Sequence, residues 1–284
     1  MKNIILIGTG LIGGSFLLEL RAIFDEAQFM GIDHNSDHIN EAIRLGIIDR
    51  EAGPEELTQA DLIIIAIPVS VIPKVLVDAL DRAADDCLII DMGSTKEQMC
   101  QVVADHPKRR NYLACHPIAG TEFSGPPAAH LGLFDGKTMI VCEVEKTAFS
   151  LQEKAMQIFK DMGMRVRYMA PRAHDKHIAY VSHLSHISSF MLGKTVIEKE
   201  KDERDIFDLA GSGFESTVRL AKSSPEMWAA IFLDNKANIL ETLEAYIKNL
   251  SIFKELIEGG DLEGLHQSMD KTNHIKQILK GISR

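Results

Sequence analysis

A histidine at position 116 is the side chain in this sequence best suited to acid–base chemistry. It directly follows an apolar run at residues 112–115. A neutral imidazole can accept the proton of a hydroxyl group while a hydride leaves the same carbon atom. Ser94 follows another apolar run, and its hydroxyl could bond to that imidazole or to the reacting hydroxyl. Structural roles compete with both assignments: His116 could be a polar residue ending a strand, and Ser94 could cap a helix that begins near Lys96.

A second group of candidates could bind an anion. Arg219 could clamp a carboxylate through two parallel N–H bonds, although an exposed arginine on a helix is the commoner case. His183 and His186 are three residues apart and share one helix face, which suits anion binding or substrate orientation better than a metal site, although the motif by itself would favour a plain helix surface. No metal site is expected, because no third ligand stands at metal spacing. Thr121 and Glu122 lie in a loop that follows His116 in sequence, where Glu122 could gate a pocket or be an ordinary charged loop residue.

The first 33 residues carry the pattern of a dinucleotide-binding unit. An apolar run leads into Gly-x-Gly-x-x-Gly at residues 8–13, and Asp33 stands twenty residues beyond the last glycine. The glycines permit a tight turn, the approach of a pyrophosphate and close packing of the next helix, whose N-terminus attracts phosphate. Asp33 favours NAD over NADP, because its carboxylate accepts from ribose hydroxyls and repels a 2′-phosphate, although His34 could become cationic and tolerate one. The residues predicted to contact the cofactor are Gly8, Gly10, Leu11, Ile12, Gly13 and Asp33.

The elements that would position these residues begin with an α/β domain over residues 1–170. Apolar runs alternate there with helical patterns, and the most continuous runs are typical of parallel strands buried on both faces. Strands are expected at residues 4–7, 29–33, 62–67, 88–92, 112–115, 138–142 and 166–169, with helices at 11–24, 37–45, 72–83, 96–104 and 148–162. This alternation predicts a doubly wound, Rossmann-type sheet. Ligands of such sheets bind at the carboxyl ends of the strands, where Ser94 and His116 would lie.

Residues 171–284 are predicted to form an all-helical domain without strands. Its long helical patterns run over residues 173–197, 225–257 and 262–279. Pro225 suits the first turn of a helix, with Ser223 and Ser224 before it as caps. Helices this long and apolar exceed what so small a domain can bury by itself. We therefore expect part of their surface to be covered by a second copy of the chain.

The composition sets limits on location and partners. The 284 residues are 45% hydrophobic and 25% charged, as in ordinary globular proteins of one large or two medium domains. The net charge of −10 argues against nucleic acid or an anionic membrane as the main partner. Four scattered cysteines are predicted to be reduced core thiols. The N-terminus begins a strand rather than a signal peptide, and no apolar run is long enough to span a membrane, so we expect a cytoplasmic protein.

Several segments together resemble the prephenate/arogenate dehydrogenase family of tyrosine biosynthesis. They are the glycine-rich motif at residues 8–15, Asp-Met-Gly-Ser-Thr-Lys at 91–96, His-Pro-Ile-Ala-Gly-Thr-Glu at 116–122, Ser-His-Leu-Ser-His at 182–186 and the stretch 213–228. The resemblance covers nearly the whole chain in the family's order. The first motif is shared by many dehydrogenases, whereas the segments at 116–122 and 219–228 are far more specific.

The resemblance implies oxidation of prephenate, a cyclohexadiene with a ring carboxylate, a pyruvyl side chain and a ring hydroxyl. Hydride passes to NAD from the hydroxyl-bearing carbon, carbon dioxide leaves, and the ring becomes aromatic 4-hydroxyphenylpyruvate. It implies that His116 deprotonates the ring hydroxyl, that Ser94 orients His116 beside the nicotinamide, and that Arg219 binds a substrate carboxylate. The other substrate-binding positions it implies are His186, His183, Thr121 and Glu122, the last two at the pocket mouth. The helical domain would form a homodimer.

Some alternatives stay open. Glu215 and Ser216 stand where family members often carry a basic–acidic pair, which puts the substrate preference in doubt. We expect prephenate rather than arogenate, since only Glu215 offers an extra acid for an ammonium group. Another NAD(P)-dependent dehydrogenase, of the β-hydroxyacid or pyrroline-carboxylate reductase type, or a dinucleotide sensor without turnover would fit less well. Because the sequence ends at residue 284, we expect no regulatory domain and no fused chorismate mutase, and we expect any inhibition by tyrosine to act at the active site.

Overall fold

The computed structural model describes residues 1–201, 203 and 205–282, and the chain divides into two compact units. The first unit is Met1–Lys236 and the second is Ala237–Arg284. Positions 202, 204, 283 and 284 of the predicted helical domain lie outside the described residues. The division predicted between residues 170 and 171 separates a cofactor-binding part of the chain from a helical part for substrate binding and dimerisation, and it stays a prediction.

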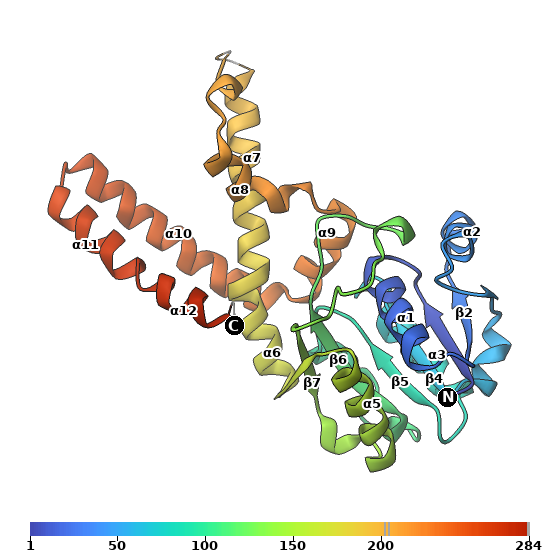
Figure 1. Ribbon diagram of the computed structural model, residues 1–284. Coiled ribbons are helices and arrows are strands. Elements are labelled where there is room, and N and C mark those ends of the chain that lie inside the picture. Colours follow the sequence, from blue (N-terminus) through green and yellow to red (C-terminus); the bar gives the residue numbers. More distant parts are fainter. Residues whose placement is uncertain (202, 204, 283–284) are drawn as a thin grey trace. The chain divides into compact units, whose positions relative to one another are not determined.

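One eight-stranded sheet organises the first unit, in the order β3-β2-β1-β4-β5-β6-β7-β8 (Figure 1). The strands are β1 Asn3–Ile7, β2 Gln28–Ile32, β3 Arg50–Glu51, β4 Leu62–Ile65, β5 Leu88–Asp91, β6 Tyr112–Ile118, β7 Thr138–Cys142 and β8 Arg165–Met169. All neighbours are parallel except β6 and β7, which are antiparallel. The strand order reverses at β1, so the predicted doubly wound sheet is confirmed.

Helices connect most of the strands, and after β8 the described residues form helices joined by turns and loops. Their bounds are α1 Leu11–Ile23, α2 Ser36–Arg44, α3 Ile72–Arg82, α4 Glu97–Val102, α5 Phe149–Asp161, α6 Pro171–Ile178, α7 Leu184–Glu200, α8 Ser212–Val218, α9 Pro225–Asp234, α10 Lys236–Glu258, α11 Leu262–Thr272 and α12 Ile275–Ile282. Among the described residues after position 169 no strand occurs, as predicted. None of the described helices combines the length and apolar character needed to cross a bilayer.

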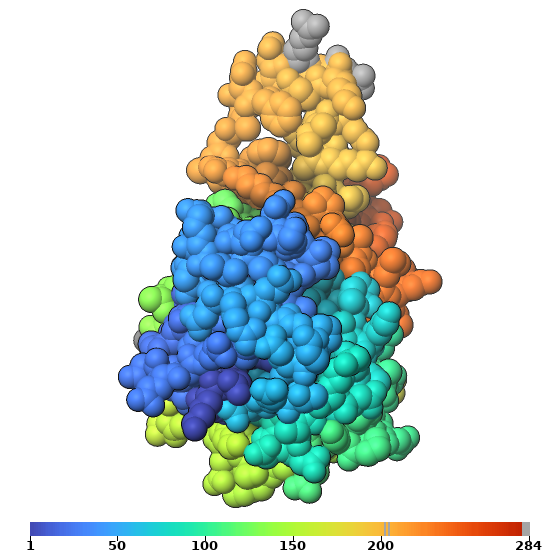
Figure 2. Space-filling model, turned by 90° about the vertical axis from the view of Figure 1, so that its right-hand side faces the viewer, coloured from blue at the N-terminus to red at the C-terminus, as the bar shows by residue number. Residues whose placement is uncertain are grey.

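Both faces of the sheet are buried, which explains its continuously apolar strands. Ile4 and Leu6 belong to a core cluster with residues of α1 and α5, whereas Ile5 and Ile63 belong to a cluster with residues of α3 and α9. Successive side chains of a strand point to opposite faces, so a strand covered on both sides has no polar alternation. The N-terminal segments, blue to cyan in Figure 2, pack closely together on the face shown. All four cysteines are buried and unpaired, as predicted.

Four predicted elements differ most from the structure in extent or continuity. Strand β6 does not end at Cys115 but continues through His116 to Ile118, because it pairs with β7 along this length. The helix expected over 225–257 is interrupted at Asn235, between α9 and α10, and the one expected over 262–279 is interrupted between α11 and α12. The pattern over 173–197 forms α6 and α7 with a π-helical turn at Ala179–His183 between them. Apolar periodicity continues across such interruptions, so it does not mark them.

Helix caps show where local patterns predict correctly and where they do not. Ser224 caps α9, with its hydroxyl accepting from the Met227 N–H, as predicted. Asn35 caps α2, with its side-chain oxygen accepting from the Asp37 N–H. The prediction that Ser94 caps the helix near Lys96 is wrong, because α4 has no side-chain cap from its own segment. Its first N–H groups are bound by a residue distant in sequence, described below.

Candidate active site

The glycine-rich loop between β1 and α1 leaves space that side chains would fill. Gly8 has a φ of +96°, in the left-handed region that favours glycine, and a Cβ there would lie 2.5 Å from the Ala66 carbonyl oxygen. A Cβ on Gly13 would lie 2.4 Å from the Gly8 carbonyl oxygen, whereas one on Gly10 would meet nothing within 4 Å. Helix α1 begins without a side-chain cap, so the N–H groups of its first turn are left for a ligand.

Asp33 lies beside this loop, directly after β2. Its carboxylate accepts from the Thr9 N–H at 2.9 Å, the Thr9 hydroxyl at 3.0 Å and the Asn35 N–H at 3.0 Å. Burial on its own would raise the pKa of this carboxyl, but the hydrogen bonds from Asn35 and Thr9 outweigh burial and the pKa lies below its usual value. Asp33 is therefore held ionised at the carboxyl end of β2, where a dinucleotide-binding sheet needs an acceptor.

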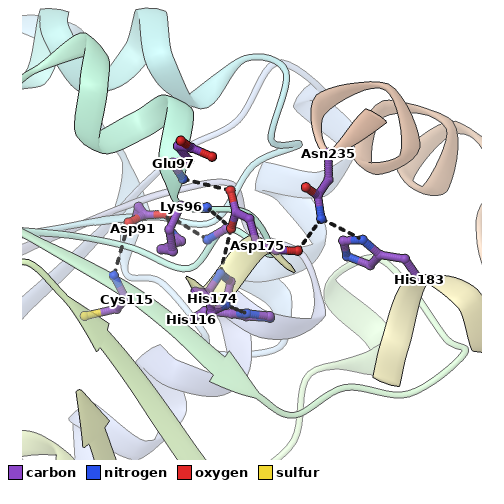
Figure 3. A network of polar contacts seen from close by, with 10 residues as sticks. Asp91, Lys96, Glu97, Cys115, His116, His174, Asp175, His183 and Asn235 are labelled. Atoms are coloured by element: carbon purple, nitrogen blue, oxygen red, sulfur yellow. Dashed lines mark hydrogen bonds and ion pairs between the residues drawn. The ribbon is translucent and has the colours of Figure 1, made fainter. Parts of the chain in front are cut away.

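His116 projects from β6 and is bonded to a second histidine. Its Nδ1 lies 2.8 Å from Nε2 of His174, which belongs to α6, and Nδ1 of His174 lies 2.7 Å from Oδ1 of Asp175 (Figure 3). The two imidazole rings meet edge to face, with centroids 5.0 Å apart. His116 is partly buried, and His174 and Asp175 are almost completely buried. The first helix after the sheet thus contacts the candidate base directly.

Asp175 is the residue that binds the start of α4. Its two carboxylate oxygens accept from the Lys96 N–H at 2.8 Å and the Glu97 N–H at 2.9 Å. In Figure 3 it lies between these N–H groups and His174. Asp175 therefore fastens α6 to the segment that follows β5, where Ser94 lies.

A buried polar cluster lies next to this region, at the ends of β5 and β6. The carboxylate of Asp91, at the end of β5, pairs with the ammonium of Lys96 and accepts from the Tyr112 hydroxyl at 2.7 Å. It also accepts from the Gly93 N–H at 2.9 Å and the Cys115 N–H at 3.2 Å. Because Asp91 and Lys96 are completely buried, these bonds hold the ends of β5 and β6 in a fixed relation. His116 is the residue that follows Cys115.

Burial keeps the His116 imidazole neutral. It lowers the pKa of His116 well below the usual value, and nearby His174 and Lys96 lower the pKa further. Protonation would place a positive charge beside an existing cation in a poorly solvated site. A neutral imidazole has one ring nitrogen that can accept a proton, as a general base requires.

The two histidines on the predicted helix face meet the single tryptophan. His186 stacks on Trp228 with centroids 3.4 Å apart, and His183 approaches the same ring edge-on at 5.9 Å. His183 Nδ1 lies 3.2 Å from Nδ2 of Asn235. Burial lowers the pKa of His183 to about 4, although Asp175 opposes the shift. Burial also lowers the pKa of His186. Both rings are therefore neutral near pH 7, and their predicted role in substrate binding stays a prediction.

Arg219 and Glu122 form an ion pair. Nη1 of Arg219 lies 3.0 Å from Oε2 of Glu122, which belongs to the loop after β6. Thr121, next in this loop, accepts from the Phe123 N–H at 3.3 Å. Burial is the main cause of the lowered pKa of His186, and the Arg219 charge lowers it further, so the two side chains are close enough to interact electrostatically. The structure thus gathers Arg219, Glu122 and His186 in one region.

Ser94 lies between β5 and α4 and is partly buried. The structure gives the hydrogen bond at His116 Nδ1 to His174, not to Ser94. A role for Ser94 in orienting the imidazole or in contacting the substrate stays a prediction. Within the described residues, no group of three or more His, Cys, Asp or Glu side chains is arranged to hold a metal ion.

Comparison with known proteins places this arrangement in a family. The family model described as prephenate dehydrogenase, nucleotide-binding domain, matches residues 17–168. The model described as prephenate dehydrogenase, dimerization domain, matches residues 170–271. The chain belongs to the prephenate dehydrogenase family. The resemblance based on the five sequence segments is thereby confirmed, and the helical half is the part that this family's dimerization model covers.

Similar proteins agree over nearly the full length. The prephenate dehydrogenase of Bacillus subtilis (strain 168) is 31% identical over 93% of this chain and 73% of its own length. The prephenate dehydrogenase of Lactococcus lactis subsp. cremoris is 29% identical over 99% of this chain and 78% of its own. The Aquifex aeolicus prephenate dehydrogenase, whose crystal structure contains hydroxyphenyl propionate and NAD⁺, superposes with a TM-score of 0.88 at 31% identity, covering 98% of both chains.

Sequence reasoning missed the contributions of His174, Asp175 and Asn235. His174 was visible only as one of several histidines near the start of the helical half, and Asp175 as an ordinary helix charge. A neighbouring His–Asp pair at the start of a helix was the available signal. Asn235 coincides with the break between α9 and α10, where its side-chain N–H donates to the Asp175 carbonyl oxygen at 2.7 Å. No local pattern indicates that contact.

Proposed function

We propose that this protein catalyses the NAD-dependent oxidative decarboxylation of prephenate to 4-hydroxyphenylpyruvate in tyrosine biosynthesis. The observation that carries the proposal is the environment of His116. Its imidazole is kept neutral, one ring nitrogen is engaged by His174, and it lies at the carboxyl end of the sheet in a chain of this family. The second ring nitrogen then accepts the proton of the ring hydroxyl.

The cofactor site fits NAD. Open space at Gly10, the uncapped N-terminus of α1 and the ionised Asp33 suit a pyrophosphate and an unphosphorylated ribose. NAD⁺ is the cofactor in the related Aquifex aeolicus complex. When bound, the dinucleotide supplies the hydride acceptor. Gly8, Gly10, Leu11, Ile12, Gly13 and Asp33 are the residues assigned to it.

The proposed substrate carries two negative charges. Although the protein is acidic overall, it offers a guanidinium group and neutral imidazole rings where the substrate would bind. Arg219 is assigned to one substrate carboxylate, through two N–H bonds in place of its present bond to Glu122. His186 and His183 are assigned to substrate binding, with Thr121 and Glu122 at the pocket mouth. Ser94 is assigned to the imidazole and the nicotinamide side.

The chemistry assigned to the protein is modest. The ring hydroxyl gives its proton to His116, the carbon gives its hydride to the cofactor, and the ring carboxylate leaves as carbon dioxide while its bonding electrons complete the aromatic ring. Aromatisation makes the overall reaction strongly downhill. The enzyme therefore has to orient the ring and remove one proton, and a positioned base is worth roughly 10²–10⁴ in rate.

The hydroxyphenyl propionate in the Aquifex aeolicus complex resembles the proposed product in its hydroxyphenyl ring and carboxylate. This likeness favours a dehydrogenase of the prephenate or arogenate type over one acting on β-hydroxyacids. A dinucleotide sensor would not need a neutral base fixed beside the cofactor edge. Prephenate is preferred to arogenate because Glu215, the candidate acid for an ammonium group, is exposed and pairs with Lys222 at 4.0 Å.

We also propose that the protein is a cytoplasmic homodimer assembled through its helical half, residues 171–284. The second unit carries many exposed apolar side chains. They include Leu240, Ile247, Leu250, Ile257 and Leu262. Such a surface is typical of an interface between copies. Light scattering after size exclusion at micromolar concentration should give twice the mass of the chain, and a monomer would contradict the proposal.

The function is tested by NADH formation with prephenate and arogenate, each with NAD and NADP. Prephenate with NAD should give the highest kcat/KM. His116→Asn should lower kcat by about 10²–10⁴ while leaving the Kd for NAD within about threefold, because only the base is removed. An NAD-binding protein with no turnover of either substrate, or a His116→Asn variant with unchanged kcat, would refute the proposal.

A further inference from the structure

Asp175, His174 and His116 form a hydrogen-bonded chain, called here the histidine relay, that ends at the proposed base. The relay joins α6 to β6 through contacts of 2.7 and 2.8 Å (Figure 3). Nothing in the reaction requires a second imidazole to touch the substrate. The question is what a buried histidine with a carboxylate behind it does to the histidine in front of it.

The carboxylate end of the relay acts as an acceptor. Asp175 receives the backbone N–H groups of Lys96 and Glu97, and backbone N–H groups can only donate. The same carboxylate contacts Nδ1 of His174. An ionised carboxylate has no proton to give, so Nδ1 of His174 carries the proton in this contact.

The proton on His174 Nδ1 decides the rest of the relay. A neutral imidazole with a proton on Nδ1 has a lone pair on Nε2, so His174 Nε2 accepts. The partner at 2.8 Å, His116 Nδ1, must then donate. His116 is left with a lone pair on Nε2. In the reverse arrangement His116 Nε2 would carry the proton and could not act as a base.

We propose that Asp175 and His174 are positioning residues that hold His116 in its Nδ1-protonated tautomer and so present Nε2 as the base. This inference rests on the proposed function for its catalytic consequence, but the tautomer is a property of the protein alone. When Nε2 takes the substrate's hydroxyl proton, Nδ1–H still donates to His174. The new positive charge therefore faces a lone pair whose ring is backed by a carboxylate.

The relay is built rigidly, as such a role requires. Asp175 and His174 are 4% and 2% exposed, so neither can turn toward solvent. Asn235 donates to the Asp175 carbonyl oxygen at 2.7 Å, and the start of α4 is bound by the carboxylate. The helices α4 and α6 and the strand β6 thus fix the orientation of each donor in the relay. Ser94, by contrast, makes no such contact with His116 Nδ1 in the structure.

The first test reads the tautomer directly in the wild-type protein. ¹⁵N-labelled histidine in the full chain gives ring nitrogen shifts, and the His116→Asn variant assigns the His116 signals. The proposal expects a protonated-type Nδ1 and an unprotonated-type Nε2 for His116 near pH 7. The opposite pattern overturns it. This measurement needs no substrate, so its result is independent of whether the proposed function holds.

The second test asks whether the side chain at position 174 acts as a hydrogen-bond acceptor or only fills space. In His174→Gln the side-chain carbonyl can still accept from His116, whereas His174→Leu has a similar bulk and no acceptor. We expect kcat with prephenate to fall by roughly 10²-fold or more in the leucine variant and by less than about tenfold in the glutamine variant, with KM and the Kd for NAD nearly unchanged. His177→Leu, an exposed position on the same helix, is the matched control and should leave kcat unchanged.

The third test reverses the direction of the hydrogen bonds in the relay while keeping a polar side chain at position 175. In Asp175→Asn an amide N–H₂ in place of Oδ1 can donate to His174 Nδ1, which favours the other tautomer through to His116 at the cost of the bond from the Lys96 N–H. The analogous change behind a catalytic histidine in serine proteases lowers kcat by about 10⁴. We expect a comparable loss and a His116 ¹⁵N pattern shifted toward a protonated Nε2. Equal kcat in the His174→Gln and His174→Leu variants, or an Asp175→Asn protein that is folded, fully active and unshifted, would overturn the proposal.

Discussion

Nη1 of Arg219 lies 3.0 Å from Oε2 of Glu122, although the two residues are 97 positions apart in sequence. The cation proposed to bind the substrate is therefore already paired with a carboxylate of the protein. The Arg219 side chain is 51% exposed and that of Glu122 is 20% exposed. Ion pairs this exposed contribute little to stability, because solvent screens them. A substrate carboxylate can replace Glu122 at little cost.

Removing the competing carboxylate should therefore favour the substrate. We expect Glu122→Gln to lower the KM for prephenate by up to about fivefold. The Tm should change by no more than a few degrees. Steady-state kinetics at low and high salt will check this, since salt should reduce the difference. A KM that rises several-fold would show that Glu122 contributes to binding instead.

Loss of Arg219 should act on binding more than on chemistry. Arg219→Ala should raise the KM for prephenate by roughly 10- to 100-fold, because charged hydrogen bonds are worth about 1.5–3 kcal/mol, with a smaller loss of kcat. Arg219→Lys keeps the charge without the two parallel N–H bonds, so its KM should lie between those of the wild type and the alanine variant. If KM is unchanged in the alanine variant, Arg219 does not bind the substrate.

Two glycines of the nucleotide loop should respond differently to alanine. In Gly13→Ala the new Cβ would lie 2.4 Å from the Gly8 carbonyl oxygen, so we expect a loss of about 1–3 kcal/mol in the free energy of unfolding. In Gly10→Ala the Cβ meets no protein atom within 4 Å, so stability should be kept. The same Cβ would occupy space assigned to the pyrophosphate, so the Kd for NAD should rise at least tenfold. Urea unfolding and NAD titration measure both, and equal stability loss in the two variants would contradict the expectation.

The buried His183 should make the fold sensitive to acid. Its pKa is lowered to about 4, whereas an unfolded chain has about 6.5. Between these values the unfolded state binds the proton and the folded state does not, so stability rises with pH across this window and is complete above about pH 6.5. The difference amounts to about 3 kcal/mol. Urea unfolding at fixed protein concentration should show His183→Asn losing less stability than wild type between pH 7 and pH 4. The exposed-residue control His266→Asn should behave as wild type does.

Local patterns were sufficient for the nucleotide loop and for seven of the eight strands of the sheet, whereas the two-residue edge strand β3 was not predicted. Continuous apolar runs such as residues 62–65 predict strands buried on both faces, and β4 is one. The spacing of Gly8 and Gly13 reflects contacts within a short βα unit, where the constraint on each residue comes from close neighbours in sequence. The family was likewise predictable, because its motifs are short and contiguous.

The tertiary structure alone decided how the candidate site is connected. His116 and His174 are 58 positions apart, and only the packing of α6 beside β6 brings their ring nitrogens to 2.8 Å. The cap of α4 comes from Asp175 rather than from Ser94 for the same reason. Hydrogen bonds between side chains depend on ångström-scale placement of whole elements, which residue type and spacing do not specify. The sequence by itself determined which groups could do chemistry, and the fold determined which of them are joined.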